Sequence, residues 1–241
     1  MIAILSDFND SEYLGVMKGV IYSISKDAKI VDLYNRVNSQ NVKEGAWILF
    51  TTYKYFPKKT VFLCVVDPGV GSEREAIAIK TKNYFFIGPD NGLLWPTINE
   101  DSIKEVVKLS TKNASLTFHG RDVFAKAAAL LDKNQNISSL GKKTEIKAQL
   151  SFHLKEREGE IVRIDNFGNI ITNLPSPNKD EYNVKVNNIN KNLKFYKTYN
   201  EAKENELFLI EGSSKTLEIS IKNGNASKKL NINIGDIIHI K

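Results

Sequence analysis

The segment Val65–Arg74 places a carboxylate, a rigid turn and a guanidinium at a spacing that suits chemistry. The apolar, β-branched run 61–66 favours a buried strand that ends at Asp67. Pro68 and two glycines stop the strand and let the backbone approach another group closely, and Arg74 follows seven residues after Asp67. Because ligands of open α/β sheets lie past the carboxyl ends of strands, Asp67 is well placed to act on a substrate. The same turn can equally serve only to end the strand, with Arg74 on the surface.

A second candidate for chemistry is His119, in the sequence TFHGRD. It precedes an alanine-rich helix expected over 123–131, with Gly120 permitting a tight turn and Asp122 expected to cap the helix. A polar residue at a helix entry can face a pocket, where the helix N-terminus favours anions. A lone histidine in such a place is also often structural, so the alternative of a purely structural His119 stays open.

Signatures of several other enzyme classes are missing from the sequence. There is no His-Glu-x-x-His, no cysteine pair and no cluster of Asp and His with metal-ligand spacing, so we predict no metal site. Gly69-Val70-Gly71 is not followed by the Lys-Ser/Thr of a phosphate loop, and Arg74 stands where a dinucleotide-binding motif has its third glycine. Gly-x-Ser-x-Gly is also missing, which leaves serine hydrolysis without support.

The composition is that of a globular protein of 241 residues, with 41% hydrophobic and 26% charged residues. The net charge of +6 raises the possibility of a nucleic-acid partner. The lysines are however scattered among acidic residues, with no basic block between aromatics. We therefore predict a solvated lysine-rich surface and no nucleic acid, and an RNA-binding β-barrel protein is an alternative suggested by charge alone.

The sequence predicts neither a membrane span nor a secreted protein. No apolar run approaches the ~20 residues that a spanning helix needs. The start, residues 1–7, reads as a short strand that meets an acid and lacks the features of a signal peptide. The single cysteine, Cys64, lies in an apolar strand and is expected to be a buried, inert thiol. A cytoplasmic location is the expectation.

Strand and helix signals alternate over residues 1–150, which predicts an α/β domain with a mostly parallel central sheet covered on both faces. Apolar residues at helical spacing indicate the helices, and short apolar runs indicate the strands. Strands are expected at Ile2–Leu5, Ile30–Leu33, Val61–Val66, Ala76–Thr81 and Tyr84–Gly88, and helices at Ser11–Ser25, Val42–Tyr55 and Val123–Leu131.

The pattern changes after about residue 150, and residues 159–241 predict a smaller all-β, barrel-like domain. Short alternating stretches are separated by turn residues, and no long helix is evident. The charged segment Lys142–Glu158 is the expected linker. Strands are expected at Glu160–Ile164, Asn169–Asn173, Tyr182–Val186, Leu207–Ile210, Leu217–Ile221 and Ile237–Ile240.

Taken together, several motifs resemble, in order, the S-adenosyl-L-methionine (SAM) hydroxide adenosyltransferase family, also called SAM hydrolases. That family is related to SAM-dependent fluorinases and chlorinases, and the resemblance runs nearly from end to end. The segments that carry it are Ser6-Asp7-Phe8, Met17-Lys18-Gly19-Val20, residues 65–71, Pro89-Asp90-Asn91-Gly92-Leu93-Leu94, residues 117–122 and Phe167-Gly168-Asn169-Ile170-Ile171-Thr172-Asn173.

The resemblance implies hydrolysis of SAM to adenosine and L-methionine, with no metal or redox cofactor. It also implies a homotrimer, with each active site formed by the α/β domain of one subunit and the β-barrel domain of its neighbour. A SAM-dependent halide transferase and a non-catalytic SAM- or adenosine-binding protein are the alternatives. Related halogenases lack the Asp-Arg-His set that this chain has at Asp67, Arg74 and His119, which favours water over halide.

The resemblance also implies roles for individual residues. Asp67, Arg74 and His119 match the set associated with the attacking water or hydroxide. Asp7 matches the aspartate that holds the ribose hydroxyls. Further substrate-binding positions are expected at Phe167 and Asn169 (adenine), Asp165 and Ser213 (the methionine end), Asn91 and Gly120.

Two departures from the family pattern concern the ribose end. Gln40 falls where the fluorinase has a tryptophan against the ribose, so that contact is not carried over. The loop Asn9–Glu12 is one residue shorter than usual in the family, and Asn9 replaces a glycine. Whether Asp10 still reaches the substrate is left open.

Overall fold

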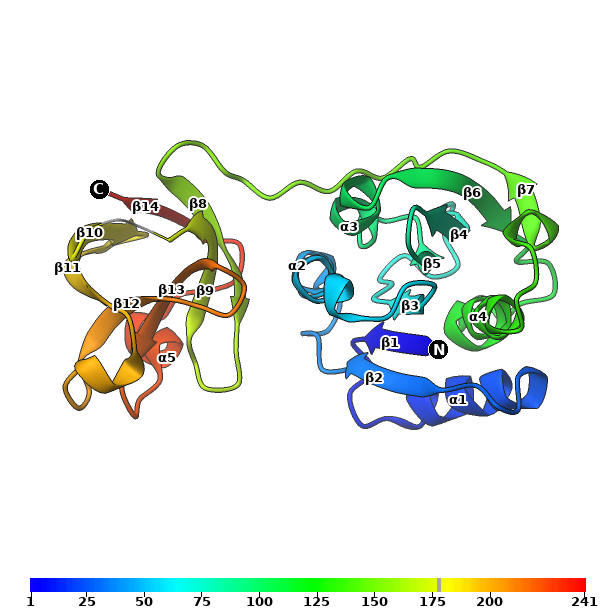
Figure 1. Ribbon diagram of the computed structural model, residues 1–241, viewed down its shortest axis with the longest axis horizontal. Coiled ribbons are helices and arrows are strands. Elements are labelled where there is room, and N and C mark those ends of the chain that lie inside the picture. Colours follow the sequence, from blue (N-terminus) through cyan, green and yellow to red (C-terminus); the bar gives the residue numbers. More distant parts are fainter. Residues whose placement is uncertain (177–178) are drawn as a thin grey trace. The chain divides into compact units, whose positions relative to one another are not determined.

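The chain divides into two compact units, residues 1–150 and residues 151–241, in the computed structural model (Figure 1). The structure describes residues 1–176 and 179–241. Each unit has its own hydrophobic core.

A seven-stranded sheet forms the centre of residues 1–150. Its strands are β1 (Ile2–Ser6), β2 (Ile30–Tyr34), β3 (Val61–Val65), β4 (Ala76–Thr81), β5 (Phe85–Pro89), β6 (Ile103–Leu109) and β7 (Gly141–Lys143). In the order β2-β1-β3-β5-β4-β6-β7, the first four strands are parallel neighbours and the remaining pairs are antiparallel. Only β4 and β7 therefore run against the other strands, which confirms the predicted mostly parallel sheet. Strands β1 and β3 are buried throughout because both faces of the sheet are covered.

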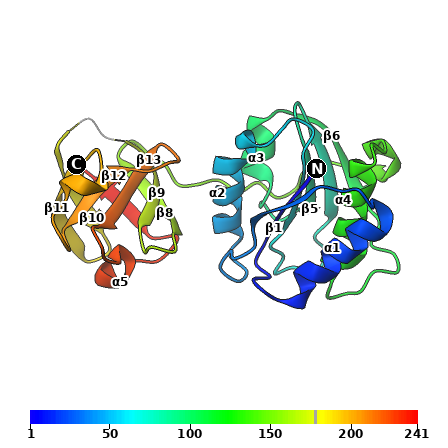
Figure 2. The same cartoon turned by 60° about the horizontal axis from the view of Figure 1, so that its bottom comes forward.

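Helices cover both faces of this sheet, as the alternation of signals predicted (Figure 2). Helices α1 and α4 pack together on one face, and α2 and α3 pack together on the other. Asn41 begins α2 by accepting a hydrogen bond from the Glu44 N–H at 3.0 Å. The helices are α1 (Glu12–Ile24), α2 (Val42–Thr52), α3 (Trp95–Glu100) and α4 (Ala125–Asp132), with short helical turns at Tyr53–Tyr55, Gly120–Phe124 and Ile137–Ser139.

The expected cap at Asp122 is wrong. The helix starts earlier, because a π-helical turn over Gly120–Phe124 precedes α4 and has His119 at its N-cap. Asp122 lies inside that turn, where its carboxylate accepts hydrogen bonds from the Ser115 N–H at 2.9 Å and from Arg121. These bonds, led by the one from Arg121, lower the pKa of Asp122 to about 2. A single π turn of this kind is frequently found at functional sites.

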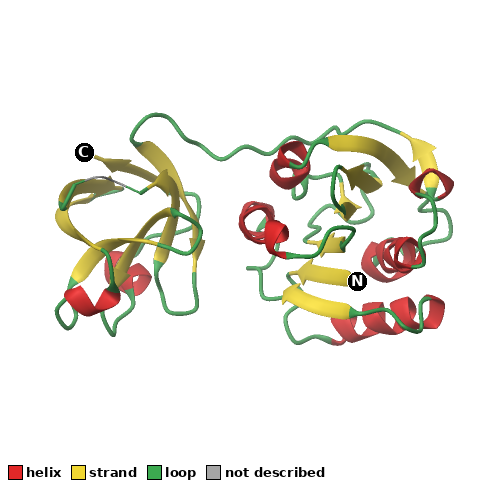
Figure 3. Cartoon of the chain, viewed as in Figure 1, coloured by secondary structure: helices red, strands yellow, loops and turns green. Residues whose placement is uncertain are grey.

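Residues 151–241 form a closed seven-stranded barrel, which confirms the predicted all-β domain (Figure 3). Its strands are β8 (Glu158–Ile164), β9 (Ile170–Pro175), β10 (Glu181–Val186), β11 (Ile189–Tyr196), β12 (Leu207–Glu211), β13 (Thr216–Ile221) and β14 (Ile237–Ile240). They close in the order β10-β11-β12-β13-β9-β8-β14 around an aliphatic core, and all recorded neighbours are antiparallel except β11 and β12. A helical turn (Tyr199–Glu201) and α5 (Ala226–Leu230) lie between strands.

Elements that the sequence did not predict are those with weak or interrupted patterns. Strand β11 has a single buried residue, Leu193, and four of its eight residues are lysine or asparagine. Strand β6 has the exposed Lys104 and Lys108 on one face and the half-buried Glu105 on the other, so its apolar alternation is interrupted. Helix α3 has Pro96 in its first turn, and α5 has five residues only.

The predicted linker Lys142–Glu158 is only partly a linker. Its first residues belong to β7, and Glu158 begins β8. The Lys147 N–H donates to Asp90 at 2.8 Å, and the Lys147 ammonium pairs with Glu75 at 2.6 Å. The bonds from lysines, that of Lys147 first, lower the pKa of Glu75 to about 2. The first half of the segment is therefore fastened to the α/β unit.

Within residues 1–176 and 179–241, no helix is long and apolar enough to cross a membrane. Cys64 is fully buried in β3, and burial raises the pKa of its thiol. This agrees with the inert thiol that its apolar surroundings predicted.

Candidate active site

Two carboxylates follow neighbouring parallel strands at one edge of the α/β sheet. Asp7 follows β1, and Asp67 follows β3, which pairs with β1. A cavity of about 700 Å³ opens beside both. Its lining consists of Asp7, Phe8, Ser11, Tyr13, Ser39, Gln40, Val65, Asp67, Pro68, Val70, Ser115, Thr117, Phe118, His119, Gly120 and Arg121. The carboxyl edge of the strands is thus where the sequence placed the chemistry.

Asp67 and Arg74 form a buried, two-pronged ion pair. Arg74 Nε donates to Asp67 Oδ1 at 2.9 Å, and Arg74 Nη2 donates to Asp67 Oδ2. Both side chains are less than a tenth exposed. Arg74 also lies over the Phe124 ring, 5.5 Å from its centroid. The pairing excludes the alternative in which Arg74 is an ordinary surface residue.

His119 joins this pair through Arg74. Its Nδ1 lies 2.8 Å from Arg74 Nη2, and the side chain is 6% exposed. A guanidinium only donates hydrogen bonds, so Nδ1 must accept, and the neutral ring carries its proton on Nε2. Burial first, and then the Arg74 charge, lower the pKa of His119 below its usual range. His119 is therefore neutral at pH 7, with an Nε2–H donor.

The turn between Asp67 and Arg74 is fixed by its own hydrogen bonds and by a glycine. The Val70 N–H donates to the Asp67 carbonyl, and the Ser72 N–H donates to the Gly69 carbonyl. Gly71 has φ +80°, and a Cβ there would lie 2.5 Å from the Leu116 carbonyl oxygen. Only glycine lets the turn approach the segment that leads to His119. This contact explains how two distant loops converge.

Asp7 uses one of its two carboxylate oxygens in a hydrogen bond within the protein. Its Oδ2 accepts the Gln40 N–H at 2.8 Å, and Gln40 has the left-handed φ of +66°. One carboxylate oxygen thus fixes the loop before α2, and Oδ1 is left to accept from another donor. Gln40 itself lines the cavity. Gln40 therefore contacts Asp7 through its backbone N–H group.

The shortened loop directs Asp10 elsewhere. Asn9 adopts φ +54°, and the Asp10 carboxylate pairs with Arg36 at 2.9 Å in an exposed position. Asp10 is not among the residues that line the cavity. Of Asp7 and Asp10, only Asp7 therefore lines the cavity.

An aromatic cluster that the sequence analysis missed forms one wall of the cavity. The rings of Phe8, Tyr13 and Phe118 meet edge to face, with centroids 5.1–6.0 Å apart. Arg121 lies over Phe118 at 5.3 Å. Phe8 and Phe118 stand within the resemblance motifs, directly beside Asp7 and His119. Their position next to charged residues was the available signal.

Gly120 and Asn91 occupy different positions in this unit. Gly120 is buried and lines the cavity. Asn91 lies outside the lining, where its side-chain amide donates to the Val66 carbonyl at 2.8 Å and accepts the Leu93 N–H. Asn91 thereby holds the end of β3 that presents Asp67.

In the barrel unit, Asp165, Phe167 and Asn169 share one tight loop between β8 and β9. Asp165 Oδ1 accepts the N–H groups of Phe167 and Asn169, each at 2.9 Å. Asp165 Oδ2 accepts Asn169 Nδ2 at 2.9 Å. Gly168 has φ +84°, and a Cβ there would clash with Asn225. This loop leaves the Phe167 side chain 78% exposed.

A buried carboxyl lies near this loop and was not singled out as a site residue. Glu218 on β13 is 7% exposed, and Gly212 leaves the room for its carboxyl group. Burial first, and then the Asp165 charge, raise the pKa of Glu218 to about 7. Ser213, the predicted contact at the methionine end, is exposed in the turn before β13.

The described residues, 1–176 and 179–241, contain no group of three or more His, Cys, Asp or Glu side chains placed to hold a metal ion. The polar groups of the cavity are arranged for hydrogen bonding and charge. What they can hold is an oxygen nucleophile near His119 and a hydroxyl-bearing ligand near Asp7.

Comparison with known families gives matches over both units. Residues 2–141 match the SAM hydroxide adenosyltransferase N-terminal domain, and residues 159–239 match the SAM hydroxide adenosyltransferase C-terminal domain. Together they span nearly the whole chain.

Similar proteins carry related names. The (R)-S-adenosyl-L-methionine hydrolase of Methanocaldococcus jannaschii is 38% identical, with 100% of this chain and 95% of the relative covered. The (R)-S-adenosyl-L-methionine hydrolase of Thermus thermophilus is 32% identical over 96% of this chain and 95% of its own. A fluorinase from Actinopolyspora mzabensis is more distant, at 24% identity over 76% of this chain and 74% of its own.

The fold is also that of a solved structure. The crystal structure of a conserved protein from Thermotoga maritima superimposes with a TM-score of 0.93, at 35% identity and with 100% of both chains covered.

Proposed function

The chain belongs to the SAM hydroxide adenosyltransferase family, and we propose that it hydrolyses SAM to adenosine and L-methionine. The observation that carries the proposal is the buried Asp67–Arg74–His119 cluster at the wall of a cavity that Asp7 also lines. The hydrolase names of the relatives agree with it.

The proposed reaction is a displacement at C5′ of the ribose. An oxygen nucleophile bonds to C5′, and the C5′–S bond breaks with its electron pair leaving on sulfur. Departure converts the sulfonium into the neutral thioether of methionine, so the leaving group needs no proton. The substitution involves no net oxidation or reduction, so the proposed reaction uses no redox cofactor. Much of the rate enhancement is expected to come from holding the oxygen about 3–3.5 Å from C5′, in line with the C5′–S bond.

The position of the proton on the neutral His119 ring favours hydroxide as the nucleophile. Because Arg74 occupies Nδ1, the Nε2–H group donates and cannot take a proton from water. Both oxygens of Asp67 are bound by Arg74, so Asp67 is also poorly placed as a base. We therefore assign to His119 the donation of a hydrogen bond to hydroxide. Arg74 adds positive potential, and its Nη1 is buried without a hydrogen-bond partner among the described residues.

Substrate binding is proposed to use both units. Asp7 Oδ1 accepts from a ribose hydroxyl. Phe167 offers an exposed ring for adenine stacking, and Asn169 Oδ1 accepts from the adenine amino group because Nδ2 is bound to Asp165. Asp165 acts at the methionine end by its charge and by shaping the loop.

The remaining assignments are supporting ones. Ser213 is proposed to contact the methionine end. Gly120 is proposed to let the substrate approach the backbone closely, and Asn91 to hold Asp67 in place through β3.

We further propose a homotrimer in which the barrel of one subunit completes the cavity of the next. Support comes from Phe167, a large ring left 78% exposed on the barrel. Coexpression of His119→Ala and Phe167→Ala chains tests the arrangement when turnover is assayed at SAM concentrations well below KM, where each variant alone is impaired. If the two residues of one site come from different subunits, random mixing restores about a quarter of the sites. Absence of any recovery in mixed oligomers would contradict shared sites.

The function is tested by incubating the protein with SAM and separating the products by chromatography. We expect adenosine and methionine in equal amounts, with no change when chloride or fluoride is added. Formation of a 5′-halo nucleoside would instead identify a halide transferase. Binding of SAM without products would identify a non-catalytic binding protein.

A further inference from the structure

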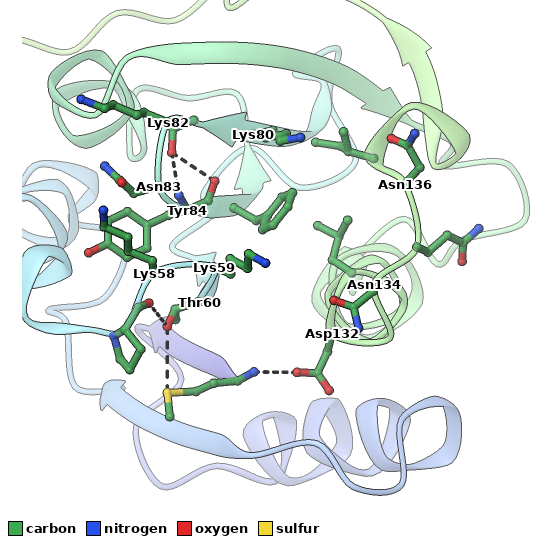
Figure 4. Close-up of a pocket in the computed structure, with 17 residues that line it drawn as sticks. Lys58, Lys59, Thr60, Lys80, Lys82, Asn83, Tyr84, Asp132, Asn134 and Asn136 are labelled. Carbon is green, nitrogen blue, oxygen red and sulfur yellow. Dashed lines mark hydrogen bonds and ion pairs between the residues drawn. The ribbon is translucent and has the colours of Figure 1, made fainter.

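A second cavity lies at the opposite edge of the α/β sheet. It has a volume of about 590 Å³ and opens at the amino ends of β3 and β5. Three segments surround it: the turn 57–60 before β3, the end of β4 with the turn that follows (residues 80–84), and residues 131–137 after α4 (Figure 4). None of its lining belongs to the cavity of the proposed active site.

Four lysines line this cavity, which we call the lysine pocket: Lys58, Lys59, Lys80 and Lys82. All four are exposed. Within residues 1–176 and 179–241, none of the four ammonium groups makes an ion pair or a side-chain hydrogen bond. Lys59 and Lys80 border the central hollow, whereas Lys58 and Lys82 extend to its outer side (Figure 4). An anion is therefore favoured beside Lys59 and Lys80, with the other two lysines adding positive potential.

The acidic groups nearby are few, and two of them accept bonds from other residues of the pocket. Asp132, which also lines the pocket, is bound by the Met1 ammonium at 2.7 Å and by the Ser25 hydroxyl at 2.8 Å. Asp101 accepts hydrogen bonds from Thr81 and Asn83. Glu105 lies opposite Lys80 in the β4–β6 register without an ion pair to it in the described chain. The four lysines and the Met1 ammonium outnumber Asp132, Asp101 and Glu105, so the pocket keeps a net positive charge.

The backbone at Lys59 is held in a conformation that costs free energy. Lys59 has φ +68°, which non-glycine residues rarely adopt, and its N–H donates to the Asn83 carbonyl at 2.7 Å. Asparagine or glycine would adopt this turn more easily. Such outliers cluster at ligand-binding sites, where the surrounding structure maintains them.

The other lining groups suit a phosphorylated small molecule. Lys59 and Lys80 lie on the side of the pocket that faces Asn134 and Asn136, whose amide groups can donate (Figure 4). Phe85 and Leu131 add apolar surface to the same lining. A hollow with cations, amides and an apolar patch matches a ligand that carries phosphates and an apolar portion.

We propose that the lysine pocket binds a small ligand with two or more phosphate groups, a nucleotide or a polyphosphate. Lys59 and Lys80 border a hollow, whereas nucleic acids and membranes are bound along extended basic strips or flat faces. The lysine pocket is separate from the proposed SAM site, and binding of the phosphate ligand is measured without SAM.

Titration calorimetry of the full chain with sodium triphosphate and, separately, with a nucleoside triphosphate tests the proposal. We expect saturable binding that weakens with salt, because the contacts are charged. Lys59→Gln with Lys80→Gln should weaken binding about tenfold, which corresponds to about 1.4 kcal/mol. Tighter binding of the nucleotide identifies it as the ligand class, and equal affinity identifies polyphosphate.

A matched control has the same loss of charge on the barrel, Lys191→Gln with Lys197→Gln, both exposed. This control should bind triphosphate like the wild type. Equal weakening in both double variants, or no binding at low salt, overturns the proposal. The proposal is also overturned if single-stranded nucleic acid or anionic vesicles bind more tightly than either small ligand and this binding requires Lys59 and Lys80. Thermal unfolding and the single variant Lys80→Gln separate these outcomes from a folding defect at Lys59.

Discussion

The Asp67–Arg74–His119 cluster and the Asp165–Asn169 loop hold their polar groups in opposite ways. In the cluster, Arg74 binds both oxygens of Asp67 and one nitrogen of His119, and all three side chains are less than a tenth exposed. In the loop, Asp165 binds backbone and amide groups of its own turn and leaves Phe167 exposed. The polar groups of the cluster are buried and bind one another, whereas the loop leaves a large aromatic side chain exposed.

Under the proposed function, this contrast gives the two regions different roles. A buried charge network fixes protonation states and orientations before a substrate arrives, which is what activation of an oxygen nucleophile needs. An exposed ring on a rigid turn gains its partner only when a ligand or another surface covers it. Substitutions in the cluster should therefore affect kcat and stability, and substitutions in the loop should affect KM.

The largest effect is expected from Asp67→Ala. It leaves the Arg74 guanidinium buried without its partner, which costs about 3–5 kcal/mol of unfolding free energy and also removes turnover. Chemical denaturation and SAM turnover measure the two effects. Asp10→Ala is the matched control, because the Asp10–Arg36 pair is exposed and should contribute less than about 1 kcal/mol. Equal stability of the two variants would show that the cluster is not a buried charge network.

Replacement of His119 separates two roles for the ring. His119→Ala should lower kcat about 10²–10³-fold with little change in KM, the size expected for loss of one preorganised donor. His119→Gln places an amide donor near the position of Nε2 and should restore part of the loss. A glutamine variant as inactive as the alanine variant would argue that His119 removes a proton. His239→Ala, at an exposed histidine, controls for loss of a ring.

In the barrel, Glu218→Gln should change how stability depends on pH. The folded chain keeps Glu218 protonated up to about pH 7, whereas the unfolded chain ionises near its ordinary pKa of 4.5. The stabilisation is thus complete below pH 4.5 and is lost as the pH rises to 7, by at most about 3 kcal/mol. Denaturation at several pH values should show this decline in the wild type and in the exposed control Glu181→Gln. A decline of the same size in Glu218→Gln would contradict the assignment.

The smallest effect is expected from Phe167→Ala. Loss of one base-stacking ring should raise KM by the equivalent of about 1–3 kcal/mol. The melting temperature should stay unchanged, because the side chain is 78% exposed. Tyr55→Ala removes a similarly exposed ring from the other unit and should leave KM unaltered. A fall in kcat without a rise in KM would place Phe167 with the cluster and remove the contrast.

The strands that carry the site could be predicted because they are buried on both faces. Val61–Val65 is a continuous apolar run, and Pro68 and Gly71 mark its end in any fold. The sequence also placed Arg74 near enough to return to Asp67. The motif around His119 was recognisable, although only the structure shows that Arg74 binds its Nδ1 and so fixes the proton on Nε2.

What could not be predicted depends on contacts between distant residues. The π turn at Gly120 differs from an α-helical start only in hydrogen-bond geometry, which explains the wrong cap at Asp122. The pKa of Glu218 depends on burial beside Gly212 and on Asp165, and these lie apart in sequence. The charged segment after Lys142 seemed to be a linker because its partners Glu75 and Asp90 are more than fifty residues away.

The most direct test of the account is SAM turnover in ¹⁸O-labelled water. If the Asp67–Arg74–His119 cluster directs hydroxide to C5′, the 5′-hydroxyl of the adenosine product will carry the label and methionine will not. The Arg74→Ala variant, which removes the group that holds both neighbours, should form no labelled adenosine above background. Unlabelled adenosine from the wild type, or full labelling at a normal rate by the variant, would contradict it.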